Sequence, residues 1–506
     1  MKTNKISNII DKCESLAAKG KVNVALSQVR KAIQKYKNDP ELLGTGAVFA
    51  SMLDKDKLAQ YYFDQALKMS KSNPAIYSNY GAFLRKIERF DDSEIAYKKA
   101  LDIKPESPTI LTNMGNLYQK IGRSEEAEKC YKKSLVLEPN SIDTLFYYGQ
   151  LLCDPFRDFD NATKIFKKVL ELKNNHEKAR FHLSLLFLRL AQYKEGWKLY
   201  ESRYKIENLK NNFIPPSENI HKLSISKWRG ESLDNKSILI WPEQGYGDFL
   251  QFCRYLYLIK EKYPYSKLLV ACKKPLYKVV TNMRCVDKAI FTEEFNKKGL
   301  KNIDYWSYIL SLPLCFNTEI DTIPNSIPYL YPENIIDKPI LGFIDDKRFN
   351  IGLVWKGNKK HSNDKNRSLS SISVLSSLWS VNNTNFISLQ KGNGEDELKK
   401  FKLPVQIAGN YIKDFQDSIN IVSKLDLVIC VDTAIAHVAG SVNTFCWVLL
   451  PYESDWRWLL DRNDSPWYPS IRLFRQAKSE SWKCVIDRVK QALEEFIKIK
   501  KRKASF

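Results

Sequence analysis

The chain contains Leu425-Asp-Leu-Val-Ile-Cys-Val-Asp-Thr-Ala-Ile-Ala-His-Val-Ala-Gly440, followed by Ser441-Val-Asn-Thr444 and the apolar run Phe445-Cys-Trp-Val-Leu-Leu450. An apolar run, a polar pair, small residues closed by a glycine and a second apolar run predict strand, turn, helix and strand, with both strands buried on two faces. This pattern is half of a doubly wound α/β domain. Ligands of such domains bind beyond the carboxyl ends of the strands, where helix N-termini present free N–H groups.

The turn in this stretch carries the first candidate site. Thr433 and His437 are four residues apart and therefore share one face of the predicted helix, close to its N-terminus. Together with Asp432 and Ala434 they predict a site for an anion, and the expected ligand carries phosphate. Two simpler interpretations stay open, because Asp-Thr before a helix is often an N-cap and a single helix histidine is often a structural contact.

Length and composition predict a globular protein of several domains, with 506 residues of which 44% are hydrophobic. The sequence has no apolar segment of transmembrane length, and Met-Lys-Thr-Asn-Lys leads into an amphipathic pattern rather than a signal peptide. We therefore expect a cytoplasmic protein without a membrane span. The ten cysteines include no CxxC pair and lie mostly in apolar runs, so we expect reduced core residues and no metal.

The chain is strongly basic, since 80 Lys and Arg against 58 Asp and Glu leave 80 − 58 = 22 positive charges. The excess is spread along the chain, and only Lys498-Ile-Lys-Lys-Arg-Lys503 is a concentrated run. This distribution indicates a solvated surface with some preference for anionic partners. Nucleic-acid binding is a weaker hypothesis, because no aromatic and basic platform accompanies the charge, and we expect no nucleic-acid partner.

A repeat dominates the first two hundred residues, and its period is 115 − 81 = 34. Small and aromatic residues recur at this spacing: Gly81, Tyr97, Ala100 and Pro105 are followed 34 positions later by Gly115, Tyr131, Ser134 and Pro139. The pattern resembles the tetratricopeptide repeat and predicts about six copies in an array over residues 1–205. Each copy is a helix pair that buries its apolar face only by stacking, which gives a superhelix with a concave groove for a peptide or protein partner. The alternative is that the repeats only support the C-terminal part of the chain.

Proline, asparagine and glycine in residues 206–235 predict a linker, after which an α/β domain is expected over residues 236–335. A strand at 237–241 leads into a turn with Gly245, Gly247 and Asp248, and a helix is expected at 249–260. The turn lacks the third glycine of the dinucleotide fingerprint and no Walker lysine follows it. Asp248 is either a helix cap or a general base that faces the cleft.

A second α/β domain is expected over residues 336–506, with strands at 350–355 and 385–389 and a terminal helix from 482 to about 499. The loop after the first of these strands carries five cationic residues and His361, a composition suited to a diphosphate. The candidate binding residues after these two strands are Lys356, Asn358, Arg367, Gln390 and Lys391.

Four segments together resemble a known family of enzymes: Gly245-Tyr-Gly-Asp248, Gly352-Leu-Val-Trp-Lys-Gly-Asn358, Val431-Asp-Thr-Ala-Ile-Ala-His437, and Asp455-Trp-Arg-Trp-Leu-Leu-Asp-Arg462 with Ser465-Pro-Trp-Tyr-Pro469. They resemble motifs of the GT-B glycosyltransferases, and within them the heptosyltransferases (glycosyltransferase family 9-like). The match extends to bacterial proteins that join tetratricopeptide repeats to such a domain. The resemblance implies an α superhelix followed by an α/β GT-B fold of two Rossmann-like domains.

The resemblance also implies roles for individual residues. Asp248 corresponds to the catalytic base that takes the proton of the acceptor hydroxyl. Asp432, Thr433, Ala434 and His437 correspond to the place where the donor diphosphate meets a helix N-terminus. Lys356, Asn358 and Arg367 correspond to groups against the leaving group, and Gln390 and Lys391 to residues beside the nucleotide. No DxD-type motif is present at either turn, so the expected mechanism needs no metal and no cofactor besides the nucleotide-sugar co-substrate.

These features predict a transferase that moves a sugar from a nucleotide donor to a protein hydroxyl held by the repeats, for example on flagellin or another surface protein. The first α/β domain is short for the fold, so acceptor recognition is expected in the repeats, a plan that resembles the protein O-GlcNAc transferases. A glycan or lipid-linked acceptor is the second choice. The rival hypothesis is a repeat scaffold whose glycosyltransferase-like domain is inactive.

Overall fold

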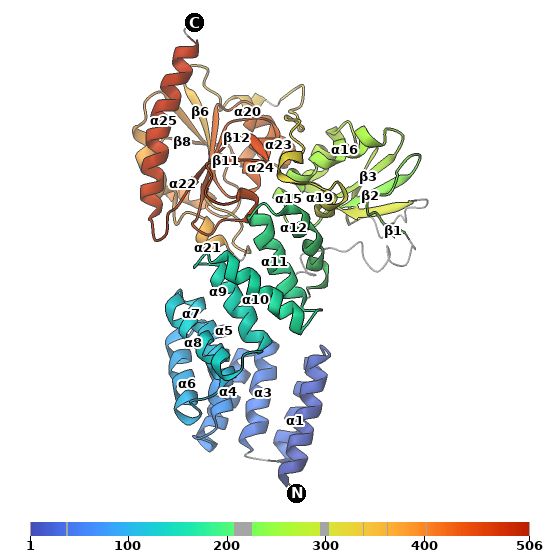
Figure 1. Cartoon of the computed structure of the whole chain (residues 1–506). Helices are drawn as coiled ribbons and strands as arrows, with labels where there is room; N and C mark the ends of the chain where they lie inside the picture. The colour runs from blue at the N-terminus through green and yellow to red at the C-terminus, as the bar shows by residue number, and fades with distance from the viewer. Residues whose placement is uncertain are drawn as a thin grey trace. The chain divides into compact units, whose positions relative to one another are not determined.

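The computed structural model of the protein describes residues 2–36, 39–206, 225–293, 303–336, 338–361, 363–400 and 402–504. The chain divides into two compact units, Met1–Ala179 and Arg180–Phe506, and Figure 1 shows helices in the first and helices with sheets in the second. Residues 207–224, most of the predicted linker, lie outside the described residues. The predicted array to residue 205 thus extends past the first unit, because its last helices belong to the second.

Unit 1 is built from consecutive helices that pack against one another as pairs, as the repeat predicts. Its helices are α1 (Lys2–Ala18), α2 (Val22–Lys35), α3 (Pro40–Met52), α4 (Asp56–Met69), α5 (Pro74–Lys86), α6 (Phe90–Ile103), α7 (Pro108–Lys120), α8 (Ser124–Leu137), α9 (Ile142–Cys153) and α10 (Phe159–Leu172). The helix α11 (Glu177–Arg189) begins in unit 1 and continues into unit 2.

Glycines allow the two helices of a pair to approach closely. A Cβ atom on Gly81 of α5 would lie 2.9 Å from the ring of Tyr97 on α6. A Cβ on Gly115 of α7 would lie 2.6 Å from the ring of Tyr131 on α8, and Gly149 of α9 meets Phe166 in the same way at 2.9 Å. Real Cβ atoms do not approach other atoms so closely, so each aromatic ring requires a glycine opposite it. This contact explains why glycine and an aromatic residue recur with the period of the repeat.

The first sheet of unit 2 is parallel, with strand order β1-β5-β2-β3-β4. Its strands are β1 (Ser226–Lys227), β2 (Ser237–Trp241), β3 (Lys267–Cys272), β4 (Lys288–Phe291) and β5 (Tyr305–Tyr308). Its helices are α15 (Tyr246–Phe252), α16 (Arg254–Lys262), η2 (Lys274–Leu276), α17 (Tyr277–Asn282), η3 (Ile309–Ser311), α19 (Leu312–Cys315) and η4 (Ile320–Thr322). β1 lies in the predicted linker, and the helix expected at 249–260 begins three residues earlier and is divided, so that Asp248 lies inside its first turn.

The second sheet has strand order β11-β12-β10-β9-β6-β7-β8, and only the β11 to β12 pairing is antiparallel. Its strands are β6 (Phe349–Val354), β7 (Thr384–Ser388), β8 (Val405–Ile407), β9 (Leu427–Val431), β10 (Cys446–Leu450), β11 (Asp464–Ser465) and β12 (Tyr468–Arg475). Its helices are α20 (Lys338–Leu341), α21 (Asp364–Arg367), η5 (Ile372–Ser380), α22 (Glu395–Lys400), η6 (Gly409–Tyr411), α23 (Phe415–Val422), α24 (Ala434–Ser441), η7 (Trp456–Trp458) and α25 (Trp482–Ala504).

Helices cover both faces of this second sheet. Apolar residues of α23 and α24 pack on one face of β9 and β10. Apolar residues of η5 and α25 pack on the other face. The parallel sheet and the strand, turn, helix and strand pattern predicted for 425–450 are confirmed, because the buried apolar runs match the strands β9 and β10.

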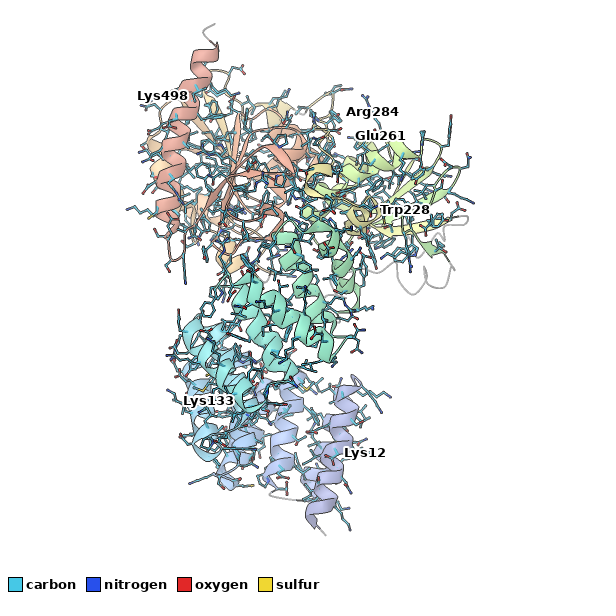
Figure 2. The ribbon with its side chains drawn as sticks, in the orientation of Figure 1. Lys12, Lys133, Trp228, Glu261, Arg284 and Lys498 are labelled. Carbon is cyan, nitrogen blue, oxygen red and sulfur yellow. The ribbon has the colours of Figure 1, made fainter. Side chains whose placement is uncertain are left out.

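The last helices before the sheets, α12 (Tyr193–Tyr200) and η1 (Glu201–Lys205), belong to unit 2. Trp197 and Tyr200 of α12 are buried in the same core as α15 and η7. The positive charge of the protein is dispersed, and Figure 2 shows Lys12 and Lys133 on the helices of unit 1 and Lys498 on α25, all exposed. Among the helices that the structure describes, none combines the length and apolar character that crossing a membrane requires.

Candidate functional site

The two turns singled out in the sequence contact each other in unit 2. Each turn follows the carboxyl end of a parallel strand, β2 in the first sheet and β9 in the second. A Cβ atom on Gly247 would lie 3.0 Å from Cδ2 of His437 and 3.4 Å from Cα of Ala434. Glycine at 247 therefore allows the start of α15 to lie directly against the start of α24. The structure brings together the two turns, as a site between two sheets requires.

Asp248 is held at both of its carboxylate oxygens. Its Oδ2 accepts the backbone N–H of Gly245 at 2.7 Å, which caps the first turn of α15. Its Oδ1 accepts a hydrogen bond from Nη2 of Arg457, in an ion pair. The structure thus supports the helix-cap interpretation of Asp248. A role as general base stays a prediction, and it requires that the ion pair open.

Arg457 is the principal charged residue that the sequence interpretation did not select, although its motif, Asp455 to Arg462, was recognised. The side chain is buried, and its Nε donates to Oε1 of Gln251 at 2.8 Å while Nη1 donates to Oδ1 of Asp455 at 2.8 Å. Burial lowers its pKa, but Asp455 and Asp248 more than offset this and hold the pKa well above the usual value. Arg457 is therefore a fixed positive charge that joins the Asp248 turn to the segment that begins at Asp455.

The start of α24 carries two polar side chains that are not consumed by the fold. Thr433 occupies the N-cap position, but its side chain forms no capping bond, and its buried Oγ1 has no hydrogen-bond partner among the described residues. Asp432 forms no ion pair with any residue in the described ranges. Burial and the neighbouring Asp455 raise the pKa of Asp432 to about 6, while Arg367 acts in the opposite direction. Asp432 can therefore exchange a proton near neutral pH.

His437 does not present a positive charge to a ligand. It is buried, its Nδ1 lies 3.0 Å from Oη of Tyr468, and its ring stacks on Trp458 with centroids 5.7 Å apart. Burial, then Arg457 and Arg254, lower its pKa to about 3, so the imidazole is neutral. The predicted contact of His437 with a phosphate stays a prediction, and a neutral ring packed against Trp458 and Tyr468 can make it only through a hydrogen bond and not through a positive charge.

The candidates after β7 are used within the fold. Gln390 is buried, its Oε1 accepts the N–H groups of Trp355 and Lys356 at 3.0 Å each, and its Nε2 donates to the carbonyls of Lys356 and Asn393 at 2.9 and 2.7 Å. Its amide therefore clamps the ends of β6 and β7, and the predicted place of Gln390 beside the nucleotide stays a prediction. Lys391 is directed to the carbonyl of Gly409, with Nζ at 2.9 Å.

The candidate residues in the loop after β6 have different surroundings. Lys356 forms an ion pair with Glu397, and its predicted place against the leaving group stays a prediction that requires this pair to open. Asn358 is exposed, and its Oδ1 accepts the N–H of Lys360 at 3.0 Å. Arg367 lies close enough to Asp432 to lower its pKa. Burial and then Arg367 lower the pKa of His361, while Asp455 and Asp248 act in the opposite direction, so this loop lies near the first turn and the segment that begins at Asp455.

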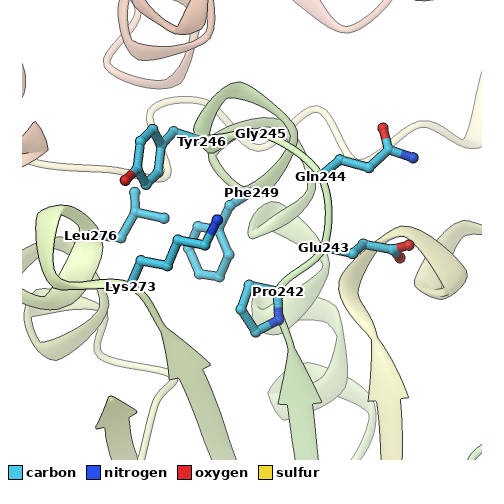
Figure 3. Close-up of a pocket in the computed structure, with 8 residues that line it drawn as sticks. All are labelled: Pro242, Glu243, Gln244, Gly245, Tyr246, Phe249, Lys273 and Leu276. Carbon is cyan, nitrogen blue, oxygen red and sulfur yellow. The ribbon is translucent and has the colours of Figure 1, made fainter. Parts of the chain in front are cut away.

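A hollow lies beside the first turn, at the carboxyl ends of β2 and β3 (Figure 3). It measures about 340 Å³, including the part open to solvent. Tyr246 is 38% exposed and its ring lies 5.2 Å from that of Phe415, while Nζ of Lys273 lies 5.6 Å from the Tyr246 centroid. The lining residues are Pro242, Glu243, Gln244, Gly245, Tyr246, Phe249, Lys273 and Leu276.

Comparison with known families concerns the helices of unit 1. Models described as tetratricopeptide repeat match residues 74–107 and residues 108–141. The first segment contains α5 and α6, and the second contains α7 and α8. These segments are tetratricopeptide repeats. The resemblance predicted from glycine and aromatic spacing is confirmed for them, and the neighbouring helix pairs extend the same pattern of packing.

Comparison with individual proteins gives partial likenesses. Protein FlbA of Caulobacter vibrioides (strain ATCC 19089 / CIP 103742 / CB 15) is 26% identical over 339 residues, which are 63% of this chain and 55% of that protein. The chain thus spans about half the length of this relative. The solved structure of PilF from Pseudomonas aeruginosa is 20% identical, with a TM-score of 0.33 over 43% of this chain and 96% of that one. A thermophilic TPR protein of Thermus thermophilus is 21% identical, with a TM-score of 0.34 over 36% and 98%.

Proposed function

We propose that the protein is a glycosyltransferase that binds a partner protein on its tetratricopeptide repeats and transfers a sugar from a nucleotide donor to it. The observation that carries the proposal is the meeting of two turns, each at the carboxyl end of a parallel strand, around fixed cationic and titratable side chains. Parallel α/β sheets bind ligands at this edge. The GT-B architecture is part of the proposal and rests on the motifs in the sequence.

In the proposed site, the start of α24 receives the donor diphosphate. Free N–H groups of the first helical turn and the unpartnered Thr433 hydroxyl supply hydrogen-bond donors. Arg367 supplies positive charge next to Asp432. Negative charge that develops on the leaving diphosphate is stabilised where helix N–H groups and a guanidinium are already oriented. The mechanism proposed here uses no metal.

The proposed chemical step conserves atoms and electrons. The oxygen of an acceptor hydroxyl forms a bond to the anomeric carbon, the bond from that carbon to the diphosphate oxygen breaks, and its electron pair stays on the diphosphate. The hydroxyl proton passes to a carboxylate. The sequence motif assigns this role to Asp248, which must first leave Arg457. Asp432, with a pKa of about 6 and no ion pair within the described ranges, is the second candidate for the base.

The proposal is tested by ligand-induced stabilisation, because a ligand that binds only the native state raises its apparent stability. Every one of the 11 tryptophans lies at position 197 or later, so tryptophan fluorescence reports on unit 2 alone. We expect one of UDP-, GDP-, ADP- or CMP-sugars to raise the unfolding temperature of the wild type. Thr433→Val should reduce this shift, whereas the control Thr444→Val, between α24 and β10, should keep it.

The second candidate function is a repeat scaffold with an inactive α/β domain. The scaffold hypothesis is favoured because Asp248, Lys356 and Gln390 already form hydrogen bonds or ion pairs inside the protein. It is also favoured by the family matches, which fall on the repeats. If no nucleotide sugar shifts the unfolding temperature of the wild type, the transferase proposal fails and the scaffold is the better account.

A further inference from the structure

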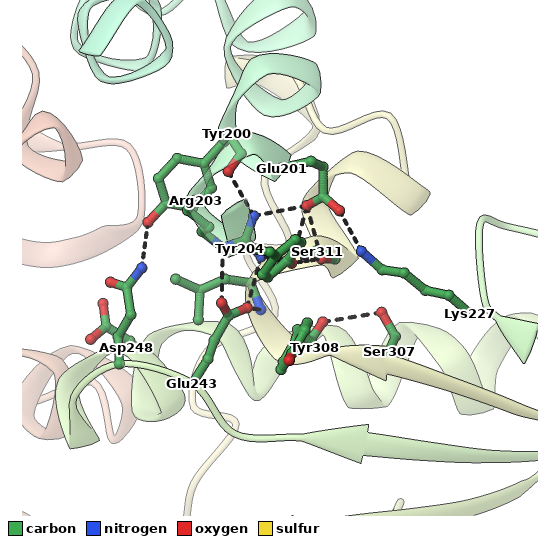
Figure 4. Close-up of polar contacts among 12 residues, drawn as sticks. Tyr200, Glu201, Arg203, Tyr204, Lys227, Glu243, Asp248, Ser307, Tyr308 and Ser311 are labelled. Atoms are coloured by element: carbon green, nitrogen blue, oxygen red, sulfur yellow. Dashed lines mark hydrogen bonds and ion pairs between the residues drawn. The ribbon is translucent and has the colours of Figure 1, made fainter. Parts of the chain in front are cut away.

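The helix α12 and the turn η1 form a buried network with the first sheet, shown in Figure 4. Arg203 of η1 and Glu243 of the turn after β2 have fully buried side chains, and two hydrogen bonds of 2.8 Å join them. Glu243 also accepts the N–H of Leu310 at 3.0 Å. Arg203 donates to the carbonyl of Tyr200 at 3.0 Å, so the end of α12 is tied to the same pair. The turn that leads to Asp248 is therefore anchored at its first residues by a helix that precedes both sheets.

Tyr200 contacts this turn at a second point. Its Oη accepts a hydrogen bond from Nε2 of Gln244 at 2.9 Å. Gln244 has a φ of 58°, a left-handed backbone conformation that is unfavourable for a residue with a side chain and persists where surrounding contacts stabilise it. Gln244 directly precedes Gly245, whose N–H is bonded to Asp248. The hydroxyl of Tyr200 thus supports the strained residue on which the geometry of the Asp248 turn depends.

The same helix also packs against the segment that carries Arg457. The ring of Trp456 lies 6.2 Å from Tyr200 and 5.4 Å from Trp197, edge-on to both rings. Trp197 is fixed in turn, because its Nε1 donates to the carbonyl of Thr318 at 3.0 Å. Arg457 follows Trp456 directly, and its guanidinium lies 4.4 Å from the centroid of that ring. One face of α12 therefore contacts both segments whose side chains meet in the Asp248 to Arg457 ion pair.

We propose that Tyr200 is a positioning residue, which sets the turn 242–248 and the segment 455–457 relative to each other so that Asp248 and Arg457 meet. The turnover part of this inference rests on the proposed transferase function, but the positioning of the turn does not. Through Tyr200, the helix α12, which continues the predicted repeat array, contributes to the geometry of the α/β site. Without the Tyr200 hydroxyl, Gln244 is released from its side-chain anchor and the turn samples other conformations.

The test compares Tyr200→Phe with Tyr255→Phe in the full-length protein. Tyr255 is the matched control, since its buried hydroxyl also makes a single 2.9 Å bond, to Thr318, but does not touch the turn. Hydrogen exchange of the amides at 244–248 should be about three- to tenfold faster in Tyr200→Phe, the range expected when one hydrogen bond is lost. In Tyr255→Phe these amides should keep the wild-type rate. Equal exchange of the turn in both variants would overturn the proposal.

A second variant separates positioning from general damage to the core. Gln244→Leu removes the same hydrogen bond from the other side and leaves α12 intact. If the two groups act together, the double variant with Tyr200→Phe exchanges no faster at the turn than either single variant. Additive effects in this cycle would contradict the inference. The cycle remains informative if one single variant folds poorly, because the exchange of the turn can be read relative to distant amides in the same sample.

Turnover supplies a readout that a purely structural role does not change. With the donor identified by the thermal panel, Tyr200→Phe should lower kcat about tenfold while the KM for the donor stays within about twofold, because the donor site at α24 is untouched. A rise in KM at unchanged kcat would contradict positioning of the Asp248 turn. If the wild type shows no turnover with any donor, the proposed function fails, and the exchange experiment still decides whether Tyr200 positions the turn.

Discussion

The buried ion pair between Glu243 and Arg203 allows a quantitative test of how the first turn is held. The change Glu243→Gln preserves the shape of the side chain but removes the negative charge and places an amide NH₂ or a single oxygen opposite the guanidinium. Removing one partner of a buried pair costs about 3 to 5 kcal/mol, because the other charge stays in the core. Arg203 keeps one carboxylate, Glu201, at 2.8 Å from its Nη1, so we expect the lower end, about 3 kcal/mol.

The assay is urea unfolding of the full-length protein followed by tryptophan fluorescence, which observes unit 2 only. With a denaturant slope of about 3 kcal/mol per molar for a unit of this size, Glu243→Gln should lower the midpoint by about 1 M. The control Glu261→Gln, an exposed residue on α16, should shift the free energy of unfolding by no more than about 0.5 kcal/mol.

A paired variant distinguishes the loss of a partner from a change in packing. In Glu243→Gln with Arg203→Met, the guanidinium that lost its partner is removed as well. Glu201 loses Arg203 but keeps Lys227 at 2.6 Å, so the double variant should be more stable than Glu243→Gln alone. The role given to the Glu243 to Arg203 pair is refuted if Glu243→Gln unfolds at the same urea concentration as the Glu261→Gln control. It is also refuted if the double variant is less stable than Glu243→Gln.

Three further predictions concern the site and its surroundings. Because the pKa of Asp432 is raised to about 6, its contribution to stability is fully present below the usual pKa of 3.8 and is lost as pH rises through about 6. Asp432→Asn should therefore raise the free energy of unfolding by up to about 3 kcal/mol at pH 7.5 and leave it unchanged at pH 3.5. Urea unfolding followed by tryptophan fluorescence measures both values. The pKa of Glu201 is shifted the other way: burial raises it, but Arg203 and Lys227 overcome this and lower it to about 2. The contribution of Glu201 to stability is therefore present above the usual pKa of 4.5 and should disappear between pH 4.5 and 2. Glu201→Gln should lose less stability than the wild type in that pH range. Gly440→Ala should destabilise unit 2 by about 1 to 3 kcal/mol in the same assay, because the new Cβ would lie 2.3 Å from the Tyr468 ring, and an unchanged midpoint would show that the ring moves freely.

Local patterns in the sequence predicted the helix pairs and the buried strands, because short-range spacing and apolar runs determine these elements. The spacing of Gly81 and Tyr97 predicted the helix pairs, since the small residue and the ring that fills its place lie within one repeat. The unbroken apolar runs before Asp432 and after Thr444 predicted strands buried on both faces, and β9 and β10 are such strands. Each turn was predicted to follow the end of a buried strand, and the structure places each there, whereas the close approach of Gly247 to His437 was not predicted.

Pairings between distant segments could not be predicted from the sequence. Arg457 meets Asp248 across 209 residues, and no periodicity indicates which of many cations faces a given carboxylate. His437 was placed on the correct helix face, but Tyr468 and Trp458, from later segments, enclose it and make it neutral. Gln390 was placed at the correct sheet edge, yet the neighbouring strand ends occupy its whole amide. In each case, tertiary neighbours that the sequence does not identify decide whether a polar side chain faces a ligand or the fold.

Release of nucleoside diphosphate shows whether the two turns form a site that transfers sugar. Water can serve as a slow acceptor, so each of the four donors is incubated with the full-length protein and the free diphosphate is measured over time. We expect release from the donor that stabilises unit 2, and about a 100-fold or greater loss of release in Asp248→Asn with donor binding retained. Release from no donor, or equal release by wild type and Asp248→Asn, would contradict the account.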